Sequence, residues 1–68
     1  MAKINQQIGE RIRVLREKRE WFQHHLAEAA GLPVRTIGRI ERGDVDVRIS
    51  TLEKIANALE TQVEQFLR

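Results

Sequence analysis

Residues 23–43 read QHHLAEAAGLPVRTIGRIERG, and this stretch contains the signals that decide the fold. A short apolar face near its start predicts a helix over residues 23–30, and that face consists of Leu26, Ala27 and Ala30. Gly31 ends this helix, because glycine takes the left-handed backbone conformation that closes helices at little cost. The stretch therefore opens with one short helix and a tight turn.

A second short helix follows the turn. Pro33 cannot extend the preceding helix, but its fixed φ suits the start of the next one. Ile37 and Ile40 lie three residues apart and share the buried face of a helix over residues 34–41, which ends near Gly43. Two short helices joined by a tight turn that contains glycine are typical of a helix-turn-helix.

The segment upstream of this pair predicts a longer helix over residues 4–19. Its apolar side chains recur at spacings of four, four and three residues, and they are Ile4, Ile8, Ile12 and Leu15. Charged residues occupy the other faces, so the pattern is that of an amphipathic helix. Trp21 and Phe22 come directly after it, and we expect both rings to form a lid on the core.

Downstream, residues 44–49 alternate apolar and polar side chains, which alone would suit a short strand. Because no second strand is available to pair with it, we expect an extended loop whose apolar side chains enter the core; they are Val45, Val47 and Ile49. Ser50 and Glu53 have the spacing of a capping box at the start of the next helix. The buried side of that helix consists of Leu52, Ile55, Ala56 and Leu59.

A last helix is expected over residues 62–67, where the apolar residues are Val63, Phe66 and Leu67. Short connections and the lack of paired strands then predict an all-α fold, a compact bundle of five helices.

The chain has 68 residues, of which 41% are hydrophobic and 32% charged, and it has no cysteine. This length allows one domain over residues 1–68 and leaves little room for the enclosed pocket that an enzyme, a cofactor or a small-molecule ligand needs. Without cysteine there is neither a disulfide nor a thiolate metal site, and no apolar run could cross a bilayer. Residues 1–5 precede no apolar block, so we expect no secretory signal and a cytoplasmic location.

Basic side chains are concentrated in the first part of the chain. Residues 1–42 carry nine basic and five acidic side chains, whereas residues 43–68 carry three basic and five acidic ones. Three of the arginines fall within eight residues, opposed only by Glu41, and they are Arg35, Arg39 and Arg42. Such a cluster is a candidate reader of phosphates or base edges, and a solvated helix face is the alternative.

Three segments, in order and at consistent spacing, carry a family resemblance. They are Ile8-Gly9-Glu10-Arg11-Ile12-Arg13-x-Leu15-Arg16, Gln23-x-x-Leu26-Ala27-x-x-Ala30-Gly31-Leu32-x-x-x-Thr36-Ile37-x-Arg39-Ile40-Glu41-Arg42-Gly43, and Ser50-x-Leu52-x-Lys54-Ile55-Ala56-x-Ala58-Leu59. Together they resemble the phage-repressor helix-turn-helix family, often called Cro-like or XRE-type. Residues 35–43 also resemble controller proteins of restriction–modification systems. The resemblance implies a lambda-repressor-like fold and a repressor or related regulator that binds double-stranded DNA.

The resemblance also implies that the helix over residues 34–41 enters the major groove, with its N-terminal end nearest the bases. Base contacts then fall on the positions expected to be exposed, which are Val34, Arg35, Gly38 and Arg39. A guanidinium can bond guanine O6 and N7, and Val34 can touch a thymine methyl. Gly38 has no side chain to read a base, so its expected use is a close approach of the backbone to the duplex.

By the same resemblance Gln23 is a phosphate clamp at a helix N-terminus, where unpaired amides attract anions. An ordinary polar residue in the first turn is the alternative. Three further residues are candidate phosphate contacts, namely His24, Thr36 and Arg42. Arg16 and Glu41 match a structural ion pair of the family that sets the angle between two helices, although Arg16 could also touch a phosphate.

The adjacent imidazoles of His24 and His25 suggest a metal site at first sight. Neighbouring helix residues point about 100° apart, and no carboxylate or cysteine completes a ligand set, so we expect no metal. The family usually has acidic residues here. Two imidazoles reduce the repulsion of phosphate, and their protonation turns it into attraction, which predicts tighter DNA binding at pH 6 than at pH 8.

Several residues depart from the family's pattern. Phe22 stands where a hydroxyl or amide usually caps the helix, and Glu20 and Glu60 stand where glycines usually end helices. A non-glycine residue in the left-handed region costs about 1–2 kcal/mol, so these two helix ends are either strained or built differently. Asp44 and Asp46 make an often basic loop acidic, which weakens phosphate contacts.

The sequence therefore predicts a sequence-specific, double-stranded DNA-binding transcriptional regulator that acts as a homodimer. The surface around Val63, Phe66 and Leu67 is the expected dimer surface, unless these residues only complete the core. The alternative is a protein-interaction module, such as an antitoxin, that binds a partner protein and binds DNA only secondarily. The acidic loop and the acidic C-terminal half support that alternative.

Overall fold

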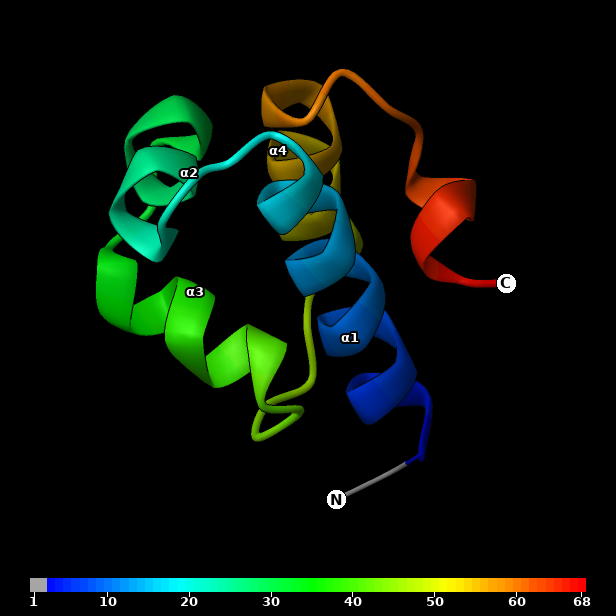
Figure 1. The fold of residues 1–68 in the computed structure, drawn as a ribbon. Coiled ribbons are helices and arrows are strands. Elements are labelled where there is room, and N and C mark those ends of the chain that lie inside the picture. The colour runs from blue at the N-terminus through cyan, green and yellow to red at the C-terminus, as the bar shows by residue number, and fades with distance from the viewer. Residues whose placement is uncertain (1–2) are drawn as a thin grey trace.

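A computed structural model describes residues 3–68, and all of the regular elements within this range are helical (Figure 1). The elements are α1 (Lys3–Lys18), α2 (Gln23–Ala30), α3 (Val34–Glu41), α4 (Ile49–Ala58) and the short 3-10 helix η1 (Val63–Phe66). The predicted all-α fold is confirmed, except that the last element is a 3-10 helix. Met1 and Ala2, part of the stretch used above to argue against a secretory signal, lie outside the described residues.

Every helix contributes at least one large side chain to a single core. The largest side chains with less than 2% exposure are Ile12, Leu26, Ile37, Leu52, Ile55 and Phe66. They come from the apolar faces that the spacing predicts, because only one side of each amphipathic helix can face the core. In Figure 1 α1 crosses in front of α4, with α2 and α3 on one side and η1 on the other. No helix within residues 3–68 has the length and apolar character needed to span a membrane.

The two helices of the turn motif have the expected bounds, and their ends explain why. Gly31 has φ of 70°, and its N–H donates to the carbonyl of Glu28. The N–H of Leu32 then donates to the carbonyl of Ala27 at 2.9 Å, which completes a Schellman end. Pro33 follows in extended conformation as the residue that caps α3, which begins at Val34.

The other three α-helices end in the same way, although two of them have no glycine available. Gly43 has φ of 75°, whereas Glu20 and Glu60 have φ of 59° and 55°. In both glutamate cases the next residue bonds the carbonyl five positions earlier, as Trp21 does with Arg16 at 3.3 Å. The family's helix ends are therefore preserved here, with two glutamates in the left-handed region where glycine costs less.

Three expectations about apolar residues are wrong at the edges of elements. Ile4, Phe22 and Ile49 are 46%, 69% and 61% exposed, so they belong to the surface. Ile4 lies in the first turn of α1, beyond the reach of the core, and Phe22 lies in the turn before α2 with its ring outward. Trp21 packs against the core as expected, with the Arg19 guanidinium 5.1 Å from its ring centroid.

The capping box expected at Ser50 is also wrong. The helix α4 begins at Ile49, two residues earlier than a cap at Ser50 implies, because the cap is Arg48, whose carbonyl accepts from Leu52 N–H at 3.0 Å. Arg48 forms no side-chain cap bond, and Ser50 is already inside the first turn. This shift turns Ile49 away from the core, whereas Val45 and Val47 pack against it as expected.

One glycine allows α1 and α3 to come into backbone contact. A Cβ added to Gly9 would lie 2.3 Å from the carbonyl oxygen of Ile40 and 2.6 Å from that of Glu41. These distances are far below any real contact, and backbone cannot move as a side chain can. The approach places the C-terminal end of α3 beside α1, which is where the Arg16–Glu41 pair forms.

Candidate nucleic-acid interface

The outer side of α3 carries two exposed arginines. Arg35 and Arg39 are exposed and Val34 is 48% exposed, while Ile37 and Ile40 on the opposite side are 0% and 2% exposed. Among residues 3–68 neither arginine takes part in an ion pair. Both guanidinium groups therefore project from the molecule with their five donors available.

Gly38 was expected to be exposed on this helix, and that expectation is wrong. It is buried. The side chains of Gln23 and Arg42 lie across it, with Arg42 Nη1 3.3 Å and Gln23 Oε1 3.5 Å from where a Cβ would be. Sequence periodicity cannot detect this cover, because it consists of long polar side chains from outside the helix face.

The expected ion pair between Arg16 and Glu41 is present and nearly closed off from water. Arg16 Nε donates to Glu41 Oε2 at 2.7 Å and Arg16 Nη2 donates to Oε1 at 3.0 Å. The Arg16 and Glu41 side chains are 9% and 3% exposed. The hydrogen bond with Glu41 raises the pKa of Arg16 above its ordinary value. A third donor, Arg16 Nη1, bonds the carbonyl of Trp21 at 2.7 Å, so the pair ties α1 to α3 and to the turn before α2.

Gln23 joins this ion pair, which the sequence did not predict. Its Nε2 donates to Glu41 Oε1 at 3.1 Å, and the residue is half-buried. The side chain expected to clamp a phosphate is thus held from one side by α3. Periodicity gives no signal for such a bond, because it joins two helices.

The start of α2 has one half of a capping box, in which a histidine side chain is the acceptor. The backbone N–H of Phe22 donates to His25 Nδ1 at 2.9 Å, and His25 thus accepts as the third residue of a capping box does. The Phe22 and His25 rings stack with their centroids 5.7 Å apart, and His24 lies 4.2 Å from His25. His24 is exposed beside them. Within residues 3–68 no group of three potential ligands could hold a metal ion.

The acidic loop is largely engaged with the rest of the molecule. Asp44 Oδ2 accepts from Arg42 Nε at 2.9 Å, and Asp46 Oδ1 accepts from the buried Asn5 Nδ2 at 2.6 Å. The second bond ties the loop to α1. Both carboxylates therefore act within the fold, which removes part of the support for an acidic docking loop, although the Asp44 contact also neutralises part of the Arg42 charge.

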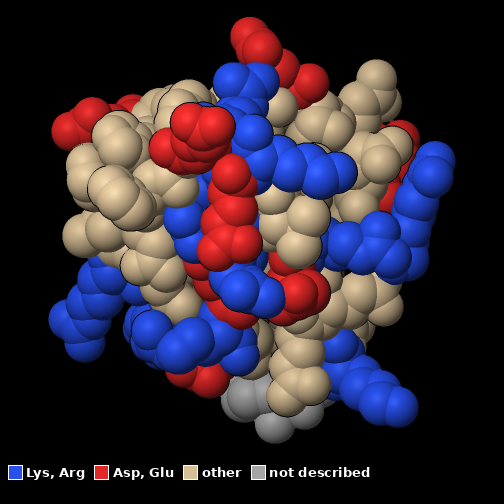
Figure 2. Space-filling view, viewed as in Figure 1, with Lys and Arg blue, Asp and Glu red and all other residues tan. Residues whose placement is uncertain are grey.

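The face formed by α1 is not of one sign. Arg13 lies between two glutamates, at 2.7 Å from Glu10 and 3.8 Å from Glu17. Figure 2 shows acidic and basic side chains interleaved over this side of the molecule. Exposed pairs of this kind contribute little stability, and the two glutamates offset the charge of Arg13 locally.

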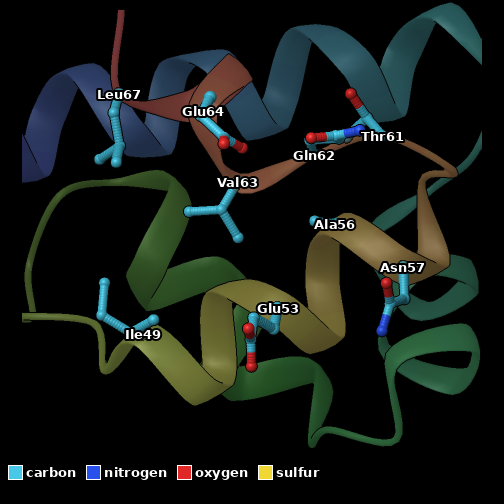
Figure 3. A pocket seen from close by; sticks show the side chains of 9 residues that line it. All are labelled: Ile49, Glu53, Ala56, Asn57, Thr61, Gln62, Val63, Glu64 and Leu67. Carbon is cyan, nitrogen blue, oxygen red and sulfur yellow. The ribbon is translucent and has the colours of Figure 1, made fainter.

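A groove of about 640 Å³ lies between α4 and η1 (Figure 3). Its apolar border is formed by Ile49 and Leu67, which are 61% and 44% exposed, together with the half-buried Val63. Phe66, also expected on a dimer surface, is 0% exposed and belongs to the core. Nearby, Gln7 and Arg11 of α1 donate to the main-chain oxygen of Arg68 and hold this last segment against α1.

Two short helices around a glycine turn, with an outward arginine pair on the second helix, define a helix-turn-helix domain. The chain belongs to the helix-turn-helix domain family, which matches residues 7–67. The predicted family is therefore confirmed.

Two proteins of known role are similar in sequence to most of this chain. It is 41% identical over 60 residues to the immunity repressor protein of Bacillus phage phi105, covering 88% of this chain and 42% of that protein. It is 38% identical over 64 residues to the control protein C.SmaI of Serratia marcescens, covering 94% of this chain and 76% of that protein. The chain thus spans less than half the length of the phage repressor.

Two solved structures of controller proteins are similar to this chain in fold. The restriction–modification controller protein C.AhdI from Aeromonas hydrophila is 31% identical with a TM-score of 0.88, covering 91% of this chain and 94% of that one. The controller protein C.Esp1396I is 26% identical with a TM-score of 0.89, covering 97% of this chain and 86% of that one. The expected similarity to controller proteins is confirmed.

Proposed function

We propose that this chain is a sequence-specific, double-stranded DNA-binding transcriptional regulator whose helix α3 enters the major groove. The exposed pair Arg35 and Arg39 is the observation that carries the proposal, because both project from α3 and neither is engaged in an ion pair within residues 3–68. A related phage protein is an immunity repressor and related bacterial proteins are controllers of restriction–modification, which supports the same role.

The proposed base contacts are Val34, Arg35 and Arg39; Gly38 is no longer among them, because it is buried. Each arginine offers two parallel donors to guanine O6 and N7, which is worth about 1–3 kcal/mol of discrimination for each pair. Val34 presents a methyl-sized apolar surface to a thymine methyl. The proposed phosphate contacts are Gln23, His24, Thr36 and Arg42, which lie on α2, on α3 and at the end of α3.

Selection of bound sites from random duplexes tests the proposal, with the wild type and Arg39→Ala compared. We expect the wild type to select a defined site and Arg39→Ala to lose the preference at one position in each half-site. A uniform weakening over all sequences would instead make Arg39 a backbone contact. Failure of the wild type to select any site would refute the proposal.

We further propose that the chain acts as a homodimer, with the groove between α4 and η1 as the contact surface. A single base-reading helix discriminates few bases, and a dimer would place two such helices on half-sites about 34 Å apart. Ile49 and Leu67 supply exposed apolar surface there, as a self-associating face requires.

The same exposed groove supports a second candidate function, the protein-interaction module that binds a partner such as a toxin. The salt dependence of duplex binding separates the two. Binding through several phosphates weakens steeply as salt rises, because counterions are released. A chain that binds duplex weakly and without that dependence would favour the interaction module. For either function we propose a single domain in the cytoplasm, without catalysis, cofactor or small-molecule ligand.

A further inference from the structure

A gap in the surface of α3 is filled by side chains that come from elsewhere. Gly38 is buried beneath Gln23 of α2 and Arg42, the residue that caps α3. A Cβ at this position would lie 3.5 Å from Gln23 Oε1 and 3.9 Å from Gln23 Nε2. The amide of Gln23 therefore lies against α3, in the space that a larger side chain at position 38 would occupy.

Glu41 holds the Gln23 amide in this place. Glu41 Oε1 accepts from Gln23 Nε2 at 3.1 Å and from Arg16 Nη2 at 3.0 Å. Because the Glu41 side chain is only 3% exposed and is bonded to Arg16 through both oxygens, its rotamer is restricted. One N–H of the Gln23 amide is used in this bond, which leaves the second for another acceptor.

We propose that Gly38 and Glu41 are positioning residues that hold the Gln23 amide in place before DNA binds, so that it meets a phosphate without losing rotamer freedom. The inference rests on the proposed function. It gives Gly38 a role other than a close approach of the backbone to the duplex. A side chain fixed in advance binds more tightly, because the entropy of ordering it has already been lost.

Gly38→Leu is the variant that separates positioning from folding. A Cβ alone would lie at ordinary contact distance from Gln23 Oε1, 3.5 Å, whereas the longer leucine side chain needs the space that the Gln23 amide occupies. The atoms that it meets are the ends of two flexible side chains, and leucine favours a helix interior more than glycine does. The unfolding midpoint should therefore stay the same or rise. Substitution of Glu41 would instead leave Arg16 as an unpaired buried charge and would confuse stability with binding.

The experiment measures duplex affinity for Gly38→Leu in three backgrounds, using the site selected by the wild type. In the wild-type background we expect Gly38→Leu to weaken binding about tenfold, or about 1.4 kcal/mol. In the Gln23→Ala background it should cause no further loss, because the side chain it displaces is absent. In the Arg42→Ala background, the matched control, the loss of about tenfold should remain.

A second readout needs no DNA. In nuclear magnetic resonance spectra of the free protein, the Gln23 side-chain amide protons should show contacts to the Cα protons at position 38 in the wild type and lose them in Gly38→Leu. Unchanged affinity of Gly38→Leu, or an equal loss with and without Gln23, would overturn the inference alone. A wild-type chain that binds no duplex would overturn the proposed function as well.

Discussion

Two glutamates at helix ends have a left-handed backbone conformation, which is unfavourable for a residue with a side chain. Glu20 and Glu60 both sit in the left-handed region that their family fills with glycine. Their surroundings differ, because Glu60 is paired with Arg19 at 2.7 Å, whereas no ion pair of Glu20 occurs within residues 3–68. The two sites therefore allow the backbone cost to be measured with and without a surface contact.

Glu20→Gly should stabilise the protein by about 1 kcal/mol, because glycine relieves the left-handed strain. For a domain of this size that gain raises Tm by about 4–8 °C. Glu60→Gly should gain less, because it loses the Arg19 contact. Thermal unfolding measures both. As a control, Gly31→Ala should lose about 1 kcal/mol, since nothing lies within 4 Å of the added Cβ and only φ opposes it. Equal stability of all three variants would contradict this account.

At the scale of elements, the relation between α1 and α3 depends on a close backbone contact and one ion pair. Gly9 permits the contact, and Arg16 with Glu41 fixes the angle at which the helices meet. The same carboxylate also reaches Gln23 of α2. A change in the α1–α3 distance would thus be transmitted to Gln23, the proposed phosphate contact on α2.

Gly9→Ala should destabilise the fold by about 1–3 kcal/mol, because its methyl group overlaps two backbone carbonyls of α3. Gly38→Ala is the matched control, since it makes the same change inside a helix but meets only flexible side-chain ends. Urea unfolding of the two variants compares them directly. Finding both equally stable would show that α1 can move away from α3 at no cost.

At the scale of the whole molecule, the surface divides into two regions with different chemistry. The outer side of α3 carries the exposed arginine pair, whereas the groove between α4 and η1 has an apolar border with acidic side chains at Glu53 and Glu64. Proposed DNA binding and proposed self-association therefore use separate faces.

Ile49→Glu should weaken self-association at least about tenfold without unfolding the chain, because the residue is 61% exposed and its new charge would face the acidic groove. Sedimentation velocity over a range of concentrations measures the effect. Val14→Glu, at a 37% exposed position on α1 outside the groove, is the control and should leave association unchanged. A wild type that remains monomeric at high concentration would refute the dimer surface.

The sequence by itself determined the all-α fold, the family and the bounds of α2 and α3. These features follow from signals within a few residues, namely apolar spacing, a glycine with positive φ and a proline at the start of a helix. The outward pair Arg35 and Arg39 also follows from this spacing, since opposite helix faces alternate with a fixed period.

Only the tertiary structure decided which polar residues bond each other and which apolar residues stay outside. Gly38 is covered, Gln23 is held by Glu41, and Asp46 is bonded to Asn5, which is 41 positions away in the chain. Such contacts join segments whose separation in sequence says nothing of their distance in space. Helix periodicity gives the direction in which a side chain leaves its own helix, but the packing angle of the helices decides what it meets there.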